Sequence, residues 1–273
     1  MSVGIVAQQG NDRAQAVATE TAATLEADGV PVSIDAVTAD ELDRPGQPVS
    51  ALASCDLVVS IGGDGTLLFV ARSVDDTPIV GVNLGEVGFL NAVAPAEASS
   101  VVPSVYTDVK AGSHELQALP RVVATGANWT CGPALNELIV HAPHRGTRAG
   151  MSLAVHVDGE PFAKTTADGV MVATPTGSTA YNLSEQGPLV GPAVECLVIN
   201  FLCPRDQTPP FVVPLDATVS IRCPQDNEAL VIADGRSRRR VGDEDVVEIT
   251  QAGTPVRIAG PRLAFLEGLA KLS

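Results

Sequence analysis

The sequence predicts two kinds of architecture in one chain: an α/β N-terminal domain with a parallel sheet and a β-rich C-terminal domain. In the first hundred residues, short apolar runs alternate with segments of helical periodicity, which is typical of a parallel sheet covered on both faces. After about residue 110 the apolar runs become short and alternating. Asp-Gly pairs at 158–159 and 234–235 separate such runs, as hairpin turns do.

The N-terminal domain begins with a predicted strand over 3–7, and Asn11 or Asp12 is placed to cap the helix that follows. Apolar or small side chains recur on this helix at i, i+3, i+4, i+7, i+8 and i+11, which places them on one face. These residues are Ala14, Val17, Ala18, Thr21, Ala22 and Leu25. Gly29 ends the helix, and further strands are predicted over 30–34, 57–61 and 78–82, with a helix over 67–72.

The C-terminal half contains six further predicted strands, over 138–140, 151–157, 170–173, 217–223, 228–233 and 246–250. The last segment, 262–272, is amphipathic and is expected to return to the first domain. We therefore predict an α/β domain over 1–110, a β-rich domain over 111–260 and a returning segment over 261–273.

Composition limits the class of protein. The chain has 273 residues, of which 45% are hydrophobic, enough for one large or two ordinary cores. Since no charge-free apolar stretch of about 18 residues occurs, no membrane span is expected. The N-terminus lacks a basic segment followed by an apolar run, so we expect no signal peptide and a cytoplasmic protein.

The charge balance is strongly acidic. There are 32 acidic and 17 basic residues, a formal net charge of −15, and only Lys110, Lys164 and Lys271 are lysines. Such a surface repels nucleic acid and anionic membranes. An Asp-rich, Lys-poor surface also suits concentrated salt, so a halophilic source is predicted; an acidic protein from a GC-rich genome is the alternative.

Cysteine and histidine patterns predict no metal site. The five cysteines include no CxxC pair, which favours buried thiols in a reducing compartment. His141 and His144 form an HxxH pair beside Pro143, but no carboxylate follows at ligand spacing.

The strongest local motif is GGDGT at 62–66, between a predicted strand and a predicted helix. Its glycines let backbone N–H groups approach an anion and permit positive φ, and the helix N-terminus adds a favourable dipole. Asp64 would repel phosphate unless it holds a metal or accepts a proton, as a hydroxyl nucleophile requires. The alternative is a Gly-Asp-Gly turn with Asp64 in solvent.

Three weaker motifs lie in the second half. The octet TPTGSTAY at 174–181 is rich in hydroxyls and fits a nucleotide contact, or a helix cap through Ser178 or Thr179. Asn136 and Glu137 precede a strand; they fit the paired hydroxyls of a ribose, or a turn. Asp168-Gly169 leads into another strand and alone would be only a turn.

A basic cluster, Arg236, Arg238, Arg239 and Arg240, follows the second Asp-Gly pair. It fits an anion-contacting hairpin near a nucleotide site or a subunit interface. The alternative is a solvated turn in which the arginines pair with Asp243, Glu244 and Asp245, in contacts that contribute little.

Taken in order, these motifs resemble the NAD kinase family. They are GGDGT (62–66), NLGxxGFL (83–90), Asn-Glu (136–137), Asp-Gly (168–169), TPTGSTAY (174–181) and a late Asp-Gly (234–235). GGDGT also occurs in lipid kinases, and a similar loop occurs in 6-phosphofructokinase, whereas TPTGSTAY after Asp-Gly is particular to NAD kinases. The resemblance implies a Rossmann-like, phosphofructokinase-like first domain.

The implied activity is transfer of a phosphoryl group from ATP or polyphosphate to the 2′-hydroxyl of the adenosine ribose of NAD, giving NADP. A divalent metal, commonly Mg²⁺, and a homodimer or homotetramer are also implied. By matched motif, Asp64 is the proton acceptor. The implied ligand-binding positions are Gly62, Gly63, Gly65, Thr66, Phe89, Asn136, Glu137, Asp168, Thr179, Ala180, Tyr181 and Ser184.

Several positions depart from the family pattern. Phe69 stands where many members have Arg or His, Glu185-Gln186 precede Gly187-Pro188, and Arg236 replaces a frequent Gln. Phe69 offers phosphate no charge. The alternatives that these departures leave are a dinucleotide-binding regulatory paralogue and a superfamily kinase with another acceptor.

Overall fold

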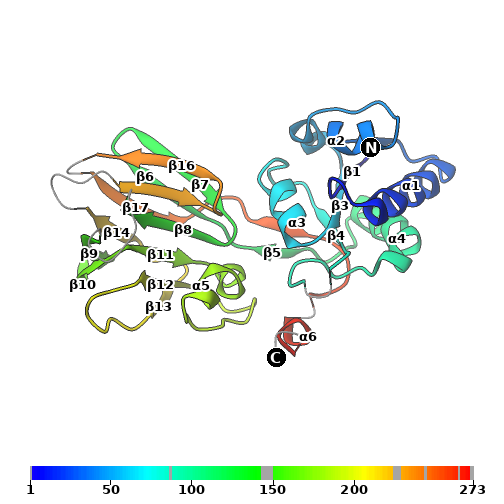
Figure 1. Ribbon diagram of the computed structural model, residues 1–273. Coiled ribbons are helices and arrows are strands. Elements are labelled where there is room, and N and C mark those ends of the chain that lie inside the picture. Colours follow the sequence, from blue (N-terminus) through cyan, green and yellow to red (C-terminus); the bar gives the residue numbers. More distant parts are fainter. Residues whose placement is uncertain are drawn as a thin grey trace. The chain divides into compact units, whose positions relative to one another are not determined.

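The computed structural model describes residues 2–85, 88–142, 150–223, 229–242, 245–263 and 265–270 (Figure 1). The chain forms two compact units, which we describe separately. The first contains Met1–Leu119 and Thr254–Ser273, and the second contains Pro120–Gly253. Among the described residues, no helix has the length and apolar character needed to cross a bilayer.

The first unit is built on a six-stranded sheet in the order β2-β1-β3-β4-β18-β5. All neighbours are parallel except β5, which is antiparallel to β18. The strands are β1 Val3–Ala7, β2 Val32–Ile34, β3 Leu57–Gly62, β4 Ile79–Asn83, β5 Gln117–Leu119 and β18 Val256–Ile258. From β1 the chain continues to β2 on one side, and from β3 it continues to β4 on the other side, so the strand order reverses between β1 and β3. Because open α/β sheets bind ligands where the strand order reverses, we expect the ligand at the carboxyl ends of β1 and β3.

Helices cover both faces of this sheet. Figure 1 shows α1 and α4 side by side on one face and α3 on the other. The helices are α1 Asp12–Ala27, α2 Ala36–Glu41, α3 Asp64–Ala71, α4 Ala98–Ala111 and α6 Phe265–Ala270, with 3-10 turns η1 Val49–Ser54 and η2 Pro95–Glu97. The apolar face predicted for the first helix is confirmed, because all six of its residues are buried in α1. Asn11 caps α1 by accepting hydrogen bonds from the amides of Arg13 and Ala14.

The second unit is a pair of six-stranded antiparallel sheets. One has the order β10-β9-β14-β17-β6-β7 and the other β13-β12-β11-β8-β15-β16. The first sheet contains β6 Val122–Gly126, β7 Trp129–Ala134, β9 Met151–Val157, β10 Glu160–Ala167, β14 Val219–Arg222 and β17 Val246–Gln251. The second contains β8 Glu137–His141, β11 Gly169–Ala173, β12 Cys196–Leu202, β13 Phe211–Pro214, β15 Ala229–Ala233 and β16 Ser237–Val241.

Side chains from both sheets of the second unit share one buried core. Leu153 and Val155 on β9 and Val170 and Val172 on β11 belong to it. The alternation of buried and exposed residues along β9 shows why the sequence pattern predicted a strand there. The two Asp-Gly pairs form hairpins, with positive φ at Asp158 and Asp234. On the outer face of the second sheet lie η3 Thr176–Thr179 and α5 Tyr181–Ser184, with Tyr181 packed against a smaller apolar cluster.

Candidate functional site

The GGDGT loop joins β3 to α3, and Asp64 is the first residue of the helix. None of its three glycines adopts the positive φ that glycine permits. A Cβ on Gly62 would lie 2.4 Å from Thr66 Oγ1, so Gly62 is needed for close packing of the turn. Around Gly63 and Gly65 a Cβ would meet nothing within 4 Å. No side chain caps α3, and the amide of Thr66 donates to the carbonyl of Gly63 at 3.0 Å.

The carboxylate of Asp64 is held by the loop that follows β4. Its Oδ2 accepts a hydrogen bond from the amide of Phe89 at 2.9 Å. Its Oδ1 accepts from the amide of Leu90 at 3.1 Å and from Nδ2 of Asn91 at 2.8 Å. These three hydrogen bonds fix the orientation of the carboxylate.

The NLGxxGFL segment is shaped around two asparagines. Oδ1 of Asn83 accepts from the amide of Gly85 at 3.0 Å, and a Cβ on Gly88 would meet the Asn83 side chain at 3.1 Å. Oδ1 of the buried Asn91 would lie 2.4 Å from a Cβ on Gly81. The glycines therefore make room for amide side chains that set the course of the loop. Glu86 and Val87 lie outside the described residues.

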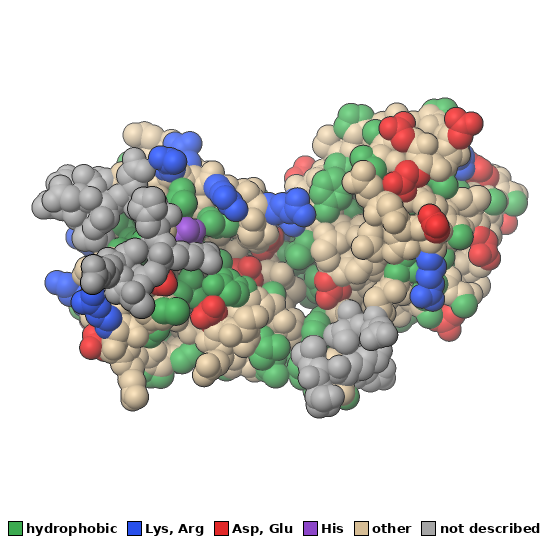
Figure 2. All heavy atoms as spheres, viewed as in Figure 1, with side chains coloured by type: hydrophobic (Ala, Val, Ile, Leu, Met, Phe, Trp, Pro, Cys, Tyr) green, Lys and Arg blue, Asp and Glu red, His purple; other side chains and the backbone are tan. Residues whose placement is uncertain are grey.

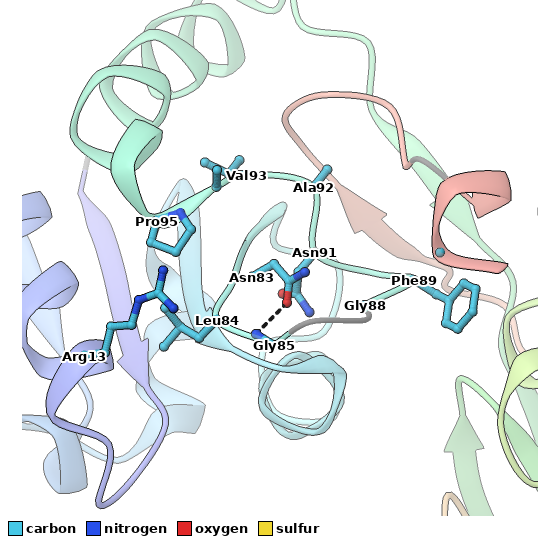
Figure 3. Close-up of a pocket in the computed structure, with 12 residues that line it drawn as sticks. Arg13, Asn83, Leu84, Gly85, Gly88, Phe89, Asn91, Ala92, Val93 and Pro95 are labelled. Atoms are coloured by element: carbon cyan, nitrogen blue, oxygen red, sulfur yellow. Dashed lines mark hydrogen bonds between the residues drawn. The ribbon is translucent and has the colours of Figure 1, made fainter. Parts of the chain in front are cut away.

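The same loop forms one wall of a pocket of about 400 Å³ in the first unit (Figure 3). Arg13 enters the pocket from the start of α1, and Pro95 and Leu84 lie beside it. Phe89 lies at the other end, where its ring is 5.6 Å from that of Phe265 on α6. Arg13 is exposed and forms no ion pair with the described residues.

The second cluster of candidate residues lies where β8 begins in the second unit. Its centre is the Asn136-Glu137 segment, which is flanked by Thr174 at the end of β11. The amide of Thr174 donates to the carbonyl of Asn136 at 2.9 Å, and its hydroxyl donates to the carbonyl of Leu135 at 2.5 Å. A Cβ on Gly177 would lie 2.0 Å from the carbonyl oxygen of Asn136, so only glycine fits there.

Asp234, in the turn between β15 and β16, contacts the same segment. Its carboxylate accepts hydrogen bonds from the amides of Leu135, Asn136 and Glu137 at 2.9, 2.8 and 3.2 Å. Three motifs that are far apart in sequence therefore meet at one short stretch of backbone.

Glu137 is an unusual carboxyl group. Its side chain is only 6% exposed, and its Oε2 has no hydrogen-bond partner among the described residues. Burial, and secondarily the charge of Asp234, raise the pKa of Glu137 to about 8. At neutral pH the free protein therefore holds this group mostly protonated, with one hydrogen to donate.

The rest of the octet folds over the outer face of the second sheet. Neither Ser178 nor Thr179 caps α5, so the helix-cap alternative is wrong. Ser178 instead donates to the carbonyl of Pro175 at 2.7 Å and accepts from the amide of Val190 at 3.1 Å. Buried Asn182 donates to the carbonyls of Ser178 and Pro188, and a Cβ on Gly187 would overlap it at 1.9 Å. The positions expected to line the ligand are partly exposed or exposed: Thr179, Ala180, Tyr181 and Ser184.

Asp168 does not join this cluster. It precedes β11, beside Ala142, whereas Thr174 follows β11, beside Asn136. At about 3.3 Å per residue, the six residues from Asp168 to Thr174 span about 20 Å along the strand.

Three members of the basic cluster, Arg238, Arg239 and Arg240, lie on the edge strand β16, and Arg236 lies in the turn before it; all four are exposed. Of its predicted acidic partners, Asp243 and Glu244 lie outside the described residues, as does His144 of the HxxH pair. Phe69 is 47% exposed on α3.

Three further residues hold these clusters together although no sequence motif marks them as site residues: Asn91, Asn182 and Asp234. Asn91 follows NLGxxGFL directly, and Asn182 follows TPTGSTAY, so both stood next to a recognised motif. Asp234 stood in the late Asp-Gly pair, which on its own indicates only a hairpin turn.

Comparison with known proteins identifies the family. The ATP-NAD kinase N-terminal domain model matches residues 3–109, and the ATP-NAD kinase C-terminal domain model matches residues 135–260. An NAD kinase of Natronomonas pharaonis is 47% identical over 272 residues, covering 100% of both chains. The chain belongs to the NAD kinase family. An NAD kinase of Halorubrum lacusprofundi is 49% identical over 275 residues, again over 100% of both chains.

Solved NAD kinase structures share the fold. An NAD kinase from Archaeoglobus fulgidus in complex with ATP matches with a TM-score of 0.75 and 26% identity, covering 100% of this chain and 97% of that one. Yeast NADH kinase complexed with NADH matches with a TM-score of 0.86 at 23% identity, covering 100% and 87% of the two chains. These neighbours confirm the predicted α/β and β-rich architecture. The acidic composition fits the haloarchaeal NAD kinases among the relatives.

Proposed function

We propose that Asp64 is the proton acceptor in the family reaction, phosphorylation of NAD at the 2′-hydroxyl of its adenosine ribose to give NADP. The observation that carries this assignment is the hydrogen-bonding of its carboxylate. A carboxylate offers about four lone-pair positions, and three are used by Phe89, Leu90 and Asn91. The remaining position, on Oδ2, is left for one hydroxyl hydrogen.

Oxygen O2′ of the ribose attacks the terminal phosphorus of the donor, and its proton passes to Oδ2 of Asp64. The bond from that phosphorus to the bridging oxygen breaks, and the leaving phosphate keeps the electron pair. Because such a transition state is loose, positioning and charge stabilisation contribute more than covalent chemistry. The open space at Gly63 and Gly65 admits the ligand close to the N–H groups of α3.

Asn136 and Glu137 are proposed to contact the ribose and the nicotinamide side of NAD. Buried Oε2 of Glu137 lacks a partner among the described residues, and a ligand hydroxyl would supply one. Since this carboxyl group is mostly protonated near neutral pH, it both donates and accepts, whereas the sequence suggested a carboxylate that only accepts. Thr179, Ala180, Tyr181 and Ser184 would form the wall for the adenine and nicotinamide rings, and Phe89 would shape the pocket.

ATP is the donor we favour, because the structural relative from Archaeoglobus fulgidus was solved with ATP. Its phosphates need positive potential in a chain of net charge −15. We place them toward Arg13, since that pocket shares Phe89 and Asn91 with the surroundings of Asp64.

A divalent ion fits as a companion of the donor rather than as an ion held by the protein alone. Among the described residues, no three His, Cys, Asp or Glu side chains come together. Mg²⁺ typically binds through one or two carboxylates together with phosphate oxygens and waters. Bound in this way, it would neutralise charge on the phosphates.

We also propose a homodimer or homotetramer. Asp168 lies at the far end of β11 from the Asn136-Glu137 segment, so its implied contact with NAD is most simply met by a second subunit. A cytoplasmic location remains a prediction.

The assignment is tested by assaying NADP formation from NAD, Mg²⁺ and ATP, with polyphosphate as a second donor. Asp64→Asn should lower kcat by about 10² or more, because an amide cannot take up the proton. The matched control is Asp35→Asn, in which a carboxylate that accepts from the amides of Val37 and Thr38 at the start of α2 is changed in the same way. Near-normal kcat in Asp64→Asn would remove the role we assign to Asp64.

A further inference from the structure

The late Asp-Gly turn reaches across the sheet to the Asn136-Glu137 segment. Asp234 follows β15, and β15 pairs antiparallel with β8, so the end of one strand lies beside the start of the other. Oδ1 of Asp234 accepts from the amides of Asn136 and Glu137 at 2.8 and 3.2 Å, and Oδ2 accepts from the amide of Leu135 at 2.9 Å. One side chain thus satisfies three consecutive backbone donors where the strand begins.

The carbonyl side of the same segment is held independently. Thr174 donates its amide to the carbonyl of Asn136 and its hydroxyl to that of Leu135. Gly177 packs against the Asn136 peptide so closely that no Cβ fits. The octet therefore holds the carbonyls of Leu135 and Asn136, whereas Asp234 holds the three amides and, through its own amide, the carbonyl of Glu137 at 3.1 Å. The backbone of the segment is thus fixed, and the side chains of Asn136 and Glu137 project from a rigid support.

We propose that Asp234 is a positioning residue for NAD, holding the Leu135–Glu137 backbone so that Asn136 and Glu137 meet the dinucleotide. This inference rests on the proposed role of Asn136 and Glu137 as NAD contacts. Asp234 does not need to touch NAD, because its two oxygens are directed at the backbone.

The side chain at 234 must accept hydrogen bonds on both of its terminal atoms. Asparagine has the same shape but presents one NH₂ group, which would oppose one of the three backbone N–H groups. Asp234 also has φ of +44°, a left-handed conformation that Asn tolerates as well as Asp does. Asp234→Asn therefore removes part of the hydrogen bonding while sparing the hairpin.

Asp158→Asn is a closely matched control. Asp158 also precedes glycine in a hairpin turn, has φ of +49°, and accepts one hydrogen bond, from the amide of Thr218 at 2.8 Å. It lies in the hairpin between β9 and β10, which belong to the other sheet of the second unit, away from Asn136 and Glu137. Asparagine keeps the single acceptor that this position needs.

The experiment measures kcat, KM for NAD, KM for ATP and Tm in the full-length protein. Asp234→Asn should raise KM for NAD roughly tenfold, as expected for disrupting hydrogen bonds to a charged group, while kcat and KM for ATP stay within about twofold. Asp158→Asn should match the wild type in all four measurements. A merely structural role would instead lower Tm and the active fraction, with KM for NAD unchanged.

Asn136→Ala distinguishes failure of this inference from failure of the site assignment. If Asn136→Ala raises KM for NAD and Asp234→Asn does not, the contact assignment stands and positioning by Asp234 is wrong. If neither variant raises KM for NAD, the assignment of Asn136 is wrong as well, and the inference falls with it.

Discussion

The carboxyl groups of Asp64 and Glu137 lie in opposite environments. Asp64 is partly exposed and receives three hydrogen bonds. Glu137 is buried beside another carboxylate, and its pKa is raised to about 8. In the function proposed above, Asp64 takes up a proton during turnover and Glu137 donates a hydrogen bond to the ligand.

The raised pKa of Glu137 predicts a pH dependence of stability. In the unfolded chain this group titrates near 4.5 and in the folded chain near 8, so folding favours its protonated form. Its contribution to stability is therefore full below about pH 4.5 and is lost as pH rises through 8. Glu137→Gln removes this dependence, because glutamine does not titrate.

The measurement is Tm of both proteins from pH 5 to pH 9. The wild type should lose Tm relative to Glu137→Gln as pH rises, since the other titrating groups are common to both. A difference in Tm that is constant with pH would contradict the environment described for Glu137.

For individual residues, the sequence predicts that Asp64 is functional, but it does not predict which groups bind its carboxylate. Asp64 stood out because a carboxylate among glycines at a strand end is chemically unusual. Its three donors lie 25 to 27 residues later, and the amides bound by Asp234 lie 97 to 99 residues earlier. Such contacts depend on how strands are ordered in a sheet, which local patterns do not specify.

At the scale of elements, periodicity was a reliable guide where one face of an element is buried. The six residues predicted for the inner face of α1 are all buried there. The glycines of GGDGT show the limit of sequence reasoning, because they would permit positive φ but none of them adopts it. Their roles are steric: Gly62 packs against Thr66, while Gly63 and Gly65 leave space.

Substitution by alanine should have different effects at a glycine whose added Cβ would clash with a neighbour and at a glycine beside open space. Gly177→Ala should destabilise the protein by at least about 2 kcal/mol, since its Cβ would overlap the Asn136 peptide. Gly63→Ala should leave Tm unchanged and reduce activity, because the added methyl group occupies the space proposed for ligand. Thermal melts and NADP assays check both.

Gly253→Ala is the control for Gly63→Ala, because it too adds a methyl group in open space at ordinary φ. It should alter neither Tm nor activity. If Gly63→Ala were as active as Gly253→Ala, the space beside Asp64 would not be used by a ligand.

At the scale of the whole molecule, net charge is the dominant property. In the view of Figure 2, acidic side chains are scattered over the α/β unit. With a net charge of −15, self-repulsion opposes folding until salt screens it. Tm should therefore rise steadily between about 0.1 M and about 2 M KCl, over which the screening length falls from about 10 Å to below about 3 Å.

Sucrose is the control for this salt titration, because it favours compact states without screening charge. A larger rise in KCl than in sucrose at matched osmolality supports the electrostatic explanation. Tm that is highest at the lowest salt concentration would contradict it.

If Asp168 of one subunit contacts NAD bound beside Asp64 of another, an Asp64 variant and an Asp168 variant should restore each other's activity in a mixed oligomer. Asp64→Asn and Asp168→Ala homo-oligomers should each be weakly active. After the two proteins are mixed, unfolded and refolded together, activity should rise, because a mixed oligomer combines an intact Asp64 in one subunit with an intact Asp168 in the other. Activity that stays at the average of the two variants would place Asp168 in the same subunit's site, or outside it.

The position of β18 has a consequence for the order of events during synthesis. Among the described residues of the first sheet, β5 pairs with β18 alone, and β18 comes from residues 256–258, after the whole second unit. On the ribosome, β5 must wait unpaired until nearly the entire chain has emerged, while the sandwich encoded between them has all its strands. We therefore expect chains truncated just before residue 256, once released from the ribosome, to contain a protease-resistant second unit and a protease-sensitive stretch at 117–119.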